Sequence, residues 1–294
     1  MNKTTAFLGL GIMGGSMAAN LARHGFEVKG WNRTPGRQSA LRAAQSGVEL
    51  KETAADAVAG AQVVFICLTD VQDIEQALFG ERAIAKAIDK GALVVDMSTT
   101  GPACARDLST KLNALGLRFL DAPVSGGDVG AREGTLTIMV GGAEDDFNQC
   151  RPWFEAMGKN IRYCGHSGAG QAVKLCNQIL CAVNMVAICE AFHLAESLDI
   201  DPKLVVEVCG TGAAGSWALS NLGPRILRGD LGPGFKIKDM LKDLRLVGEA
   251  LSNGTTKDIL PGTTLAAEKF VTARDCDGTN GGDQGTQAMI SAYR

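Results

Sequence analysis

Three glycines near the N-terminus constrain the fold of this chain more than any other feature. Residues 5–11 read TAFLGLG, an apolar segment that predicts a short buried strand running into glycine. Residues 12–24 have the pattern of a helix that ends at Gly25, and residues 26–31 predict a second strand. A strand, a helix and a strand within about thirty residues form one βαβ unit. The chain should therefore begin with an α/β domain.

The spacing of Gly9, Gly11 and Gly14 also predicts a ligand. In a GxGxxG turn, the first glycine permits the tight turn, the second lets the backbone approach a pyrophosphate, and the third lets helix and strand pack closely. The start of the helix, with Ile12 and Met13, then faces the phosphates. The turn therefore predicts a dinucleotide site, with a glycine-rich turn that only packs a helix on a sheet as the alternative.

The end of the second strand indicates which dinucleotide to expect. An NAD site normally has Asp or Glu there, which bonds the ribose 2′-hydroxyl. This chain has Asn32, Arg33 and Thr34, and Arg37 follows a turn later. No acid stands in this segment to repel a 2′-phosphate, and two guanidinium groups could bind it bidentately. We predict NADP rather than NAD. The alternative is that both arginines are solvated loop charges.

Strands and helices continue to alternate beyond this unit. The next predicted strands are 63–68, 93–96 and 118–122. Residues that follow parallel strands line the ligand crevice, so Leu68, Thr69 and Thr99 are expected to contact the ribose and nicotinamide of the cofactor. The alternative for this region is that Thr69 or Thr100 caps the following helix.

A second glycine-rich turn predicts an anion site. Ser125, Gly126 and Gly127 follow the strand that ends at residue 122, and such a turn exposes several backbone N–H groups in a small space. It suits a carboxylate, and a plain hairpin loop is the alternative. The following predicted elements are a polar loop to residue 134, a strand at 135–140, a helix at 145–157 and a strand at 160–164. The first domain should therefore span residues 1–164.

Residues 168–198 predict one helix of about eight turns, rich in Ala, Leu, Val and Cys. A helix this apolar should be buried on most sides, yet Lys174, Asn177, Cys181 and Asn184 share one face of it. Buried Lys and Asn are costly unless something pairs with them, so we interpret this face as the floor of a site. Only helices are predicted beyond it, so residues 165–294 should form an all-α domain.

Composition narrows the class of protein. A net charge of −3 gives no case for nucleic acid or a membrane surface. The long helix alone reaches the length of a membrane span, and polar residues interrupt it. The N-terminus has no signal-peptide pattern.

The nine cysteines form no CxxC pair, and Cys176, Cys181 and Cys189 are expected to be buried thiols in a reducing compartment. We expect a cytoplasmic protein without a metal site, since the three histidines are scattered.

Four longer signatures occur in one order along the chain: FLGLGIMGGSMAANL at 7–21, DAPVSGG at 121–127 with GTLTIMVGG at 134–142, GHSGAGQAVKLCNQ at 165–178, and KDLRL at 242–246. Together they resemble the β-hydroxyacid dehydrogenases, which include 3-hydroxyisobutyrate dehydrogenase, tartronate semialdehyde reductase and the glyoxylate/succinic semialdehyde reductases. Gln178 departs from the second asparagine that is usual in this family. The resemblance covers the chain from end to end. It implies a Rossmann-type doubly wound sheet, joined through a long interdomain helix to an all-α domain.

The resemblance also implies roles for single residues. Lys174 would be the catalytic lysine, and Asn177, with residues 125–127, would hold the carboxylate and hydroxyl end of the substrate. Lys242 would reach the cofactor, and Thr99 matches a cofactor-side position. The family uses no metal for catalysis and commonly forms dimers or tetramers through its helical domain, so we expect a homodimer or homotetramer.

These features predict an NADP(H)-dependent oxidoreductase that interconverts a small semialdehyde or 2-oxo acid and its hydroxy acid. Lys174 would serve as the general acid and base of the hydride transfer. Three alternatives stay open. They are an NAD-dependent 3-hydroxyisobutyrate-type dehydrogenase, a non-catalytic dinucleotide-binding module, and an imine-reducing relative, which would be expected to lack the lysine.

Overall fold

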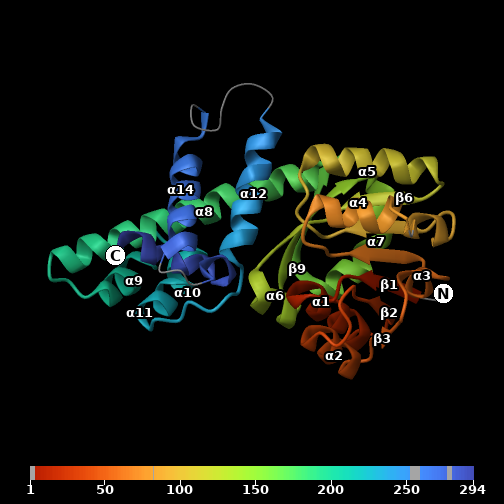
Figure 1. The fold of residues 1–294 in the computed structure, drawn as a ribbon, viewed down its shortest axis with the longest axis horizontal. Coiled ribbons are helices and arrows are strands. Elements are labelled where there is room, and N and C mark those ends of the chain that lie inside the picture. The colour runs from red at the N-terminus through yellow and green to blue at the C-terminus, as the bar shows by residue number, and fades with distance from the viewer. Residues whose placement is uncertain (1–3, 82, 252–258, 277–279) are drawn as a thin grey trace. The chain divides into compact units, whose positions relative to one another are not determined.

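The computed structural model describes residues 4–81, 83–251, 259–276 and 280–294 of the 294-residue chain (Figure 1). The chain forms two compact units, Met1–Lys174 and Leu175–Arg294. The predicted boundary after residue 164 lies earlier, before the long helix, and stays a prediction. The contacts move the division into the helix because its first residues pack on the sheet of the first unit, where a Cβ on Gly170 would lie 2.3 Å from the Met139 carbonyl oxygen.

The first unit is built on one mixed sheet. Its strands are β1 (Thr4–Leu8), β2 (Glu27–Trp31), β3 (Glu49–Leu50), β4 (Val63–Ile66), β5 (Leu93–Asp96), β6 (Arg118–Asp121), β7 (Val124–Ser125), β8 (Leu136–Gly142) and β9 (Gly158–Gly165). Parallel strands follow the order β3-β2-β1-β4-β5-β6, and β8 then pairs antiparallel with β6 and β7 and parallel with β9. This is the order of a doubly wound dinucleotide-binding sheet, whose ligand crevice opens between β1 and β4.

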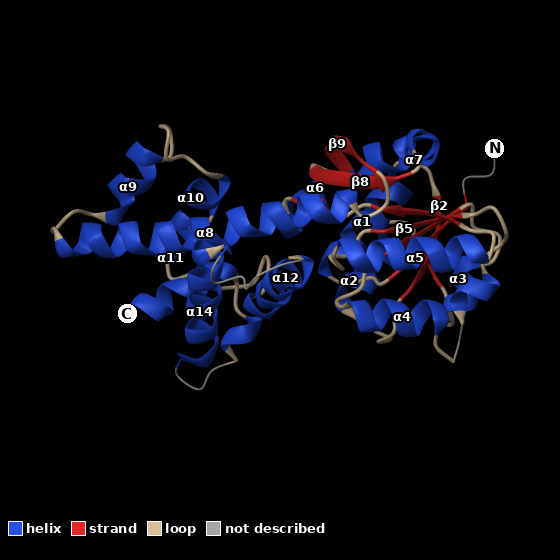
Figure 2. Ribbon diagram, turned by 90° about the horizontal axis from the view of Figure 1, so that it is seen from above, coloured by secondary structure: helices blue, strands red, loops and turns tan. Residues whose placement is uncertain are grey.

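Helices cover both faces of this sheet. They are α1 (Ile12–Arg23), α2 (Gln38–Gln45), α3 (Ala54–Val58), α4 (Val71–Phe79), the 3₁₀ segment Ile84–Ala87, α5 (Pro102–Ala114), α6 (Gly127–Glu133) and α7 (Glu144–Met157). Successive strand residues point to opposite faces, so Phe65 packs in one core with α1 and α7, and Ile66 packs in the other with α4 and α5. Figure 2 shows α4 and α5 on the side of the sheet opposite α7. Both faces are buried at the centre of the sheet, so every residue of β1, β4 and β5 is buried, whereas β2, β3 and β9 contain exposed charged residues.

The polar loop predicted to residue 134 is wrong, because Gly127–Glu133 form helix α6. Glycine disfavours a helix interior, and Gly130 hid this helix from the sequence pattern. Tertiary contact with α1 overrides that preference. Asn20 of α1 is buried, and its Nδ2 donates a hydrogen bond of 2.8 Å to the Ala131 carbonyl oxygen.

The second unit is helical in its described residues, as predicted. Its elements are α8 (Ala169–Ser197), which begins in the first unit, α9 (Pro202–Cys209), α10 (Trp217–Asn221), α11 (Gly223–Leu227), α12 (Ile237–Ala250), α14 (Pro261–Asp275) and the 3₁₀ segments Gly281–Asp283 and Thr286–Tyr293. Its core joins Met185 and Phe192 of α8 to Met240 of α12 and Phe270 of α14. These contacts bury one side of α8 over its second half.

Helix α8 is long and apolar enough to span a membrane by length and composition alone, and 44% of its most apolar window is buried inside the protein. A core helix of a soluble protein passes the same test, so one such helix is weak evidence for a membrane. Its thiols differ from the expectation of uniform burial. Cys189 is buried, Cys181 is half-buried and Cys176 is exposed.

Candidate active site

The glycine turn lies where predicted, between β1 and α1. Gly9 has φ +96°, which L side chains rarely adopt, and a Cβ on Gly14 would lie 2.0 Å from the Gly9 carbonyl oxygen. Gly11 is the N-cap of α1, and in the described chain no side chain caps this helix. The first N–H groups of α1, with those of Ile12 and Met13 among them, therefore form the kind of helix start that binds phosphate.

The segment after β2 is held against this turn by Asn32. Its Oδ1 accepts a hydrogen bond of 3.0 Å from the Leu10 N–H, and its Nδ2 donates one of 2.8 Å to the Thr34 carbonyl oxygen. Asn32 thus braces the glycine turn, a role that the sequence did not indicate. Thr34 is exposed in the same short loop, and its contact with the cofactor stays a prediction.

The two arginines of this loop lie in different surroundings. The Arg37 guanidinium reaches the glycine turn, since a Cβ built on Gly11 would lie 3.8 Å from its Nη1. Arg33 is exposed, and its Nη1 lies 2.6 Å from Oδ1 of Asp73 on α4. The sequence segment itself has no acid, but the fold brings one to Arg33 from α4.

The ends of β4 and β5 are joined by hydrogen bonds. The Leu68 N–H donates to Ser98 Oγ at 2.9 Å. The Ser98 N–H donates to Asp96 Oδ1 at 2.9 Å, and Thr100 Oγ1 donates to Asp96 Oδ2 at 3.2 Å. Thr99 is half-buried within this loop. The predicted cofactor contacts of these two strands therefore lie at their carboxyl ends, beside the crevice of the sheet.

Neither threonine considered as a helix cap has that role. Asp70, rather than the exposed Thr69, caps α4 by accepting a hydrogen bond of 2.7 Å from the Val71 N–H. Gly101 precedes α5, and Thr100 bonds Asp96 instead. The capping alternative is therefore wrong, although a cofactor contact of Thr69 stays a prediction.

Asp96 gives the fold a pH dependence. Complete burial raises the pKa of Asp96 from 3.8 to about 6, although bonds from Ser98 and Thr100 oppose the rise. The folded protein then binds this proton more tightly than the unfolded chain, so Asp96 costs stability as the pH rises from 3.8 to about 6. Asp96→Asn should therefore raise the free energy of unfolding above this range, by at most about 3 kcal/mol, and bring little gain below it.

Urea unfolding of wild type and D96N under acidic and mildly alkaline conditions would measure this difference. Asn can still accept from the Ser98 N–H, so the exchange removes mainly the charge. The exposed Asp89 supplies a control, since Asp89→Asn should change stability little at either pH. A D96N variant that is less stable than wild type under alkaline conditions would contradict the expectation.

Asp121 caps the start of α8. Its Oδ1 accepts a hydrogen bond of 2.7 Å from the Gly168 N–H, and its Oδ2 accepts one of 2.9 Å from the Gln171 N–H. Burial raises the pKa of Asp121, and these backbone donors oppose the rise. Asp121 is paired in register with Asp96 on the neighbouring strand, so two buried carboxyl groups lie side by side. A carboxylate at a helix N-terminus is favoured by the helix dipole.

Gln171 joins this helix start to the loop after β5. Its Oε1 accepts hydrogen bonds from the N–H groups of Thr100 and Gly101, at 3.0 Å and 3.1 Å. Its Nε2 donates a bond of 2.8 Å to the Ser98 carbonyl oxygen. Lys174 follows at a spacing of three and is only 7% exposed. The start of α8, with its buried lysine, is therefore fixed at the carboxyl ends of β5 and β6.

The second glycine-rich turn leads into a helix instead of a hairpin loop. Ser125 ends β7 and pairs with Thr137 of β8, and α6 begins at Gly127. Gly126 and Gly127 have φ values of +128° and +64°, which favour glycine. The plain-loop alternative is thus wrong, and the assignment of residues 125–127 to a carboxylate stays a prediction.

A chain of polar side chains links α8 to α12 within the second unit. Asn177 Nδ2 donates to Gln178 Oε1 at 2.9 Å, and Gln178 Nε2 donates to Asp243 Oδ2 at 2.6 Å. Asp243 Oδ1 forms an ion pair with Lys242 Nζ at a distance of 3.1 Å. The geometry of this contact is not that of a hydrogen bond. Asp243 is buried, and a buried carboxylate needs such partners. The predicted Asn177 and Lys242 are therefore the two ends of one polar chain.

The buried polar face of α8 differs from the predicted one. It consists of Gln171, Lys174 and Gln178, at 0%, 7% and 2% exposure, whereas Asn177 is half-buried. Five residues of these networks were missed by sequence reasoning: Asp96, Asp121, Gln171, Gln178 and Asp243. Four of them are polar residues inside or at the end of an apolar segment, which is the same signal that identified Lys174, whereas Asp243 lies among the charged residues of α12.

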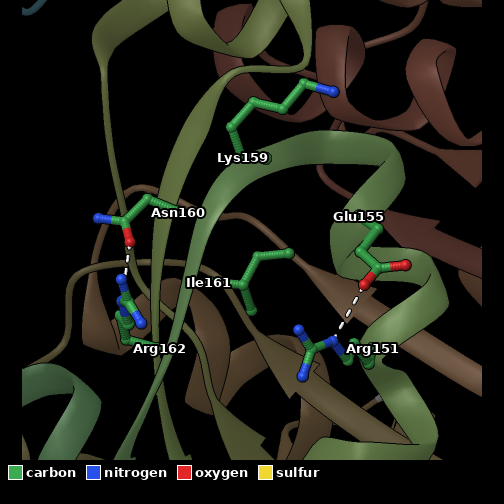
Figure 3. A pocket seen from close by; sticks show the side chains of 7 residues that line it. Arg151, Glu155, Lys159, Asn160, Ile161 and Arg162 are labelled. Atoms are coloured by element: carbon green, nitrogen blue, oxygen red, sulfur yellow. Dashed lines mark hydrogen bonds and ion pairs between the residues drawn. The ribbon is translucent and has the colours of Figure 1, made fainter.

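A cleft on the surface of a protein need not mark its chemistry. A cleft of about 410 Å³ lies between α7 and β9, lined by Arg151, Glu155 and residues 158–162 (Figure 3). Arg151 donates to Glu155 and Arg162 donates to Asn160, so these guanidinium groups already have partners. The cleft contains none of the predicted site residues. Over the described ranges of the chain, no group of three or more His, Cys, Asp and Glu could hold a metal ion.

Two family models together match nearly the whole chain. Residues 4–165 match the NAD binding domain of 6-phosphogluconate dehydrogenase, and residues 168–293 match the NAD-binding model of NADP-dependent 3-hydroxyisobutyrate dehydrogenase. The 2-hydroxy-3-oxopropionate reductase of Escherichia coli is 40% identical over 279 residues, which cover 95% of this chain and 92% of that protein. The chain belongs to the β-hydroxyacid dehydrogenase family.

Members of this dehydrogenase family carry names that differ in cofactor and substrate. An NAD-dependent L-serine dehydrogenase of Pseudomonas aeruginosa is 39% identical over 255 residues, which cover 84% of this chain and 85% of that protein. A solved structure of Mycobacterium tuberculosis 3-hydroxyisobutyrate dehydrogenase with L-serine matches 100% of both chains, with a TM-score of 0.85 and 34% identity. The chain is therefore an oxidoreductase with a nicotinamide dinucleotide-binding domain.

Proposed function

We propose that this β-hydroxyacid dehydrogenase interconverts a small semialdehyde or 2-oxo acid and its hydroxy acid, using NADP(H). The position of Lys174 supports the proposal most. This buried lysine stands on the turn of α8 that Asp121 and Gln171 tie to the ends of β6 and β5. In a doubly wound sheet the cofactor binds at the carboxyl ends of the strands, so a lysine at this place can meet the reacting carbonyl.

A bound nicotinamide dinucleotide supplies the hydride in reduction and takes it up in oxidation. Lys174 donates the proton in reduction and accepts it in oxidation. Its ammonium group donates a proton to the carbonyl oxygen as that oxygen gains negative charge, and its neutral amine accepts the proton of the hydroxyl group in the reverse direction. The neutral form of a lysine becomes more abundant as the pH rises. Reduction should therefore proceed at neutral pH, and oxidation should improve under alkaline conditions.

Further polar groups are proposed to hold the substrate. Asn177 follows Lys174 at a spacing of three on α8, so the two side chains lie on adjoining parts of the helix surface. Gln178 accepts a hydrogen bond from the Asn177 amide, and this bond supports a fixed orientation for it. We assign the hydroxyl end of the substrate to Asn177, its carboxylate to residues 125–127, and the cofactor side to Lys242 and Thr99.

The preference for NADP is proposed from the two arginines after β2. Arg37 beside the glycine turn supports it directly. Arg33 is held by Asp73, but its side chain is 74% exposed, and an ion pair this exposed contributes no more than about 1 kcal/mol. Arg33 could therefore exchange Asp73 for a 2′-phosphate at low cost. In the rival NAD-dependent enzyme, Arg33 would keep Asp73 as its partner.

Arg37→Met should lower kcat/KM for NADPH by about 10- to 100-fold, the loss expected when a charge-assisted hydrogen bond to phosphate is removed. The same change should leave kcat/KM for NADH within about 3-fold, because NADH has no 2′-phosphate. Arg42, an exposed arginine of α2, gives the matched control variant Arg42→Met. An equal loss with both cofactors, or a wild-type enzyme that prefers NADH, would contradict the NADP proposal.

A substrate screen tests the function itself. Oxidation of NADPH and of NADH would be followed with glyoxylate, succinic semialdehyde, tartronate semialdehyde and 3-oxopropanoate. Methylglyoxal, an aldehyde without a carboxylate, is the matched control compound. We expect at least one acid to be reduced with kcat/KM of about 10⁴ M⁻¹s⁻¹ or more. A protein that binds the dinucleotide and reduces none of them would be the non-catalytic module instead.

We further propose a cytoplasmic homodimer or homotetramer. Several large apolar side chains of the helical unit are exposed by half or more: Leu194, Leu198, Leu204, Val208 and Trp217. They belong to α8, α9 and α10 or directly adjoin them, and exposed apolar surface of this extent is typical of protein interfaces. Light scattering of the purified protein would give the number of subunits, and a monomer would refute this assignment.

A further inference from the structure

Gln171 is the point at which three segments of the first unit meet. Its backbone N–H donates to Asp121 at the end of β6, and its side chain makes three hydrogen bonds to residues 98–101 after β5. The partners are separated from Gln171 by 50 to 73 positions in the chain. Gln171 therefore fixes the start of α8 against two different strand ends at once.

The loop that Gln171 grips is itself fixed to the sheet. Asp96, the last residue of β5, accepts hydrogen bonds from the Ser98 N–H and from Thr100 Oγ1. Ser98 Oγ accepts a bond from the Leu68 N–H beyond β4. Residues 98–101 thus have a defined position relative to β4 and β5. Any shift of α8 along its axis must break hydrogen bonds to this loop.

The position of Gln171 is transmitted to Lys174 through one helical turn. Three residues of α-helix span about 4.5 Å, and residues at this spacing are neighbours on the helix surface. Both side chains are buried, and the helix backbone between them is continuous, although Ala172 and Val173 on the other face of this turn are exposed. An apolar side chain of similar length could fill this space without hydrogen bonds, so packing alone does not require an amide here.

We propose that Gln171 is the positioning residue of Lys174, which sets the height and rotation of the lysine relative to the loop after β5. The inference rests on the proposed function, in which Lys174 transfers the substrate proton. Gln171 does not touch the reacting atoms in this scheme. It acts by holding the ammonium group at the place where the carbonyl oxygen develops charge. Misplacement of a catalytic group by about 1 Å can cost a factor of about 100 in rate.

Gln171→Met is the decisive variant, because it keeps the length of the side chain and removes all three of its hydrogen bonds to the loop. We expect kcat to fall by about 10- to 100-fold, while the Kd for NADPH stays within about 3-fold of wild type. Gln171→Glu keeps the acceptor for the Thr100 and Gly101 N–H groups but loses the donor to the Ser98 carbonyl oxygen. The kcat of Q171E should lie between the values of wild type and Q171M.

The control must lose a buried glutamine elsewhere. Gln287 is 1% exposed, and its Nε2 donates to the carbonyl oxygens of Asp230 and Gly232 in the second unit. Gln287→Met should lower stability in the same way but leave kcat per folded molecule near the wild-type value. If Q171M and Q287M lose kcat equally, or if Q171M keeps the wild-type kcat, the positioning role is wrong.

Hydrogen exchange gives a readout that needs no turnover. Amides in residues 168–174 should exchange at least about 10-fold faster in Q171M than in wild type, and Q287M should leave them unchanged. A wild-type protein without activity on any carbonyl acid would overturn the proposed function, whereas the exchange rates would still decide whether Gln171 anchors α8. Unchanged exchange in Q171M overturns the inference whatever the activity.

Discussion

Lys174→Met should lower kcat for reduction by about 10²- to 10⁴-fold, the range that general acid catalysis contributes. The lysine is 7% exposed and lies one helical turn after Gln171, so its replacement removes the proposed proton donor without changing the glycine turn, which is the proposed dinucleotide site. The Kd for NADPH should therefore stay within about 3-fold of wild type. Steady-state kinetics and fluorescence titration of NADPH would measure the two quantities.

Val173 provides the matched control on the same turn of α8. Its side chain is 44% exposed, and Val173→Ala should leave kcat close to the wild-type value. Chemical rescue adds a second check, since a small primary amine in solution could restore part of the proton transfer to Lys174→Ala. Near-normal turnover by K174M, with the protein folded and NADPH bound, would remove Lys174 from the mechanism.

Gly14→Ala should destabilise the first unit more strongly than any other single change discussed above. The added Cβ would lie 2.0 Å from the Gly9 carbonyl oxygen and 3.1 Å from the Phe7 ring, and the first distance is far below any real contact of this type. The clash involves backbone, so it cannot be relieved by a rotamer change. We expect the free energy of unfolding to fall by more than about 3 kcal/mol, as measured by urea unfolding.

Substitutions at two other glycines distinguish an effect on stability from an effect on cofactor binding. A Cβ on Gly11 would meet only the Arg37 guanidinium at 3.8 Å, so Gly11→Ala should fold like wild type. Its methyl group would occupy the place where a pyrophosphate approaches, and the Kd for NADPH should rise at least about 10-fold. Gly212 has no atom within 4 Å of such a Cβ, and Gly212→Ala should change neither quantity. A Gly14→Ala protein with wild-type stability would contradict the close packing of β1 and α1.

The sequence predicts the first unit well because its signals are local. A buried parallel strand is apolar on both faces, and the helix start after Gly11 follows from glycine spacing within a few residues. Helix α6 escaped prediction because it depends on tertiary contacts such as the hydrogen bond from Asn20, which is 111 positions from its partner Ala131. Helix propensity carries no information about such a contact.

In the candidate site, too, local features were predicted and long-range contacts were not. Lys174 was indicated because a charged residue interrupts an apolar helix, and Gln171 interrupts the same helix at a spacing of three. The type of residue was visible, but its partner was not, since Thr100 is 71 positions away. The acid opposite Arg33 was missed for the same reason, because Asp73 belongs to α4 and meets Arg33 only in the folded sheet.

The hydrogen bonds of Gln171 and Asp121 at the start of α8 limit how this protein could be recombined with its relatives. A crossover after residue 164 would keep α8 intact, yet it would take Gln171 from one parent and its partners Thr100 and Asp121 from the other. The partners of the Gln171 side chain in residues 98–101 are backbone groups, so the other parent has to supply the conformation of this loop, which Asp96 holds, together with the Asp121 carboxylate. Recombined enzymes should keep a fast proton transfer only where both parents share this set of hydrogen bonds, so the helical part is not a freely interchangeable module.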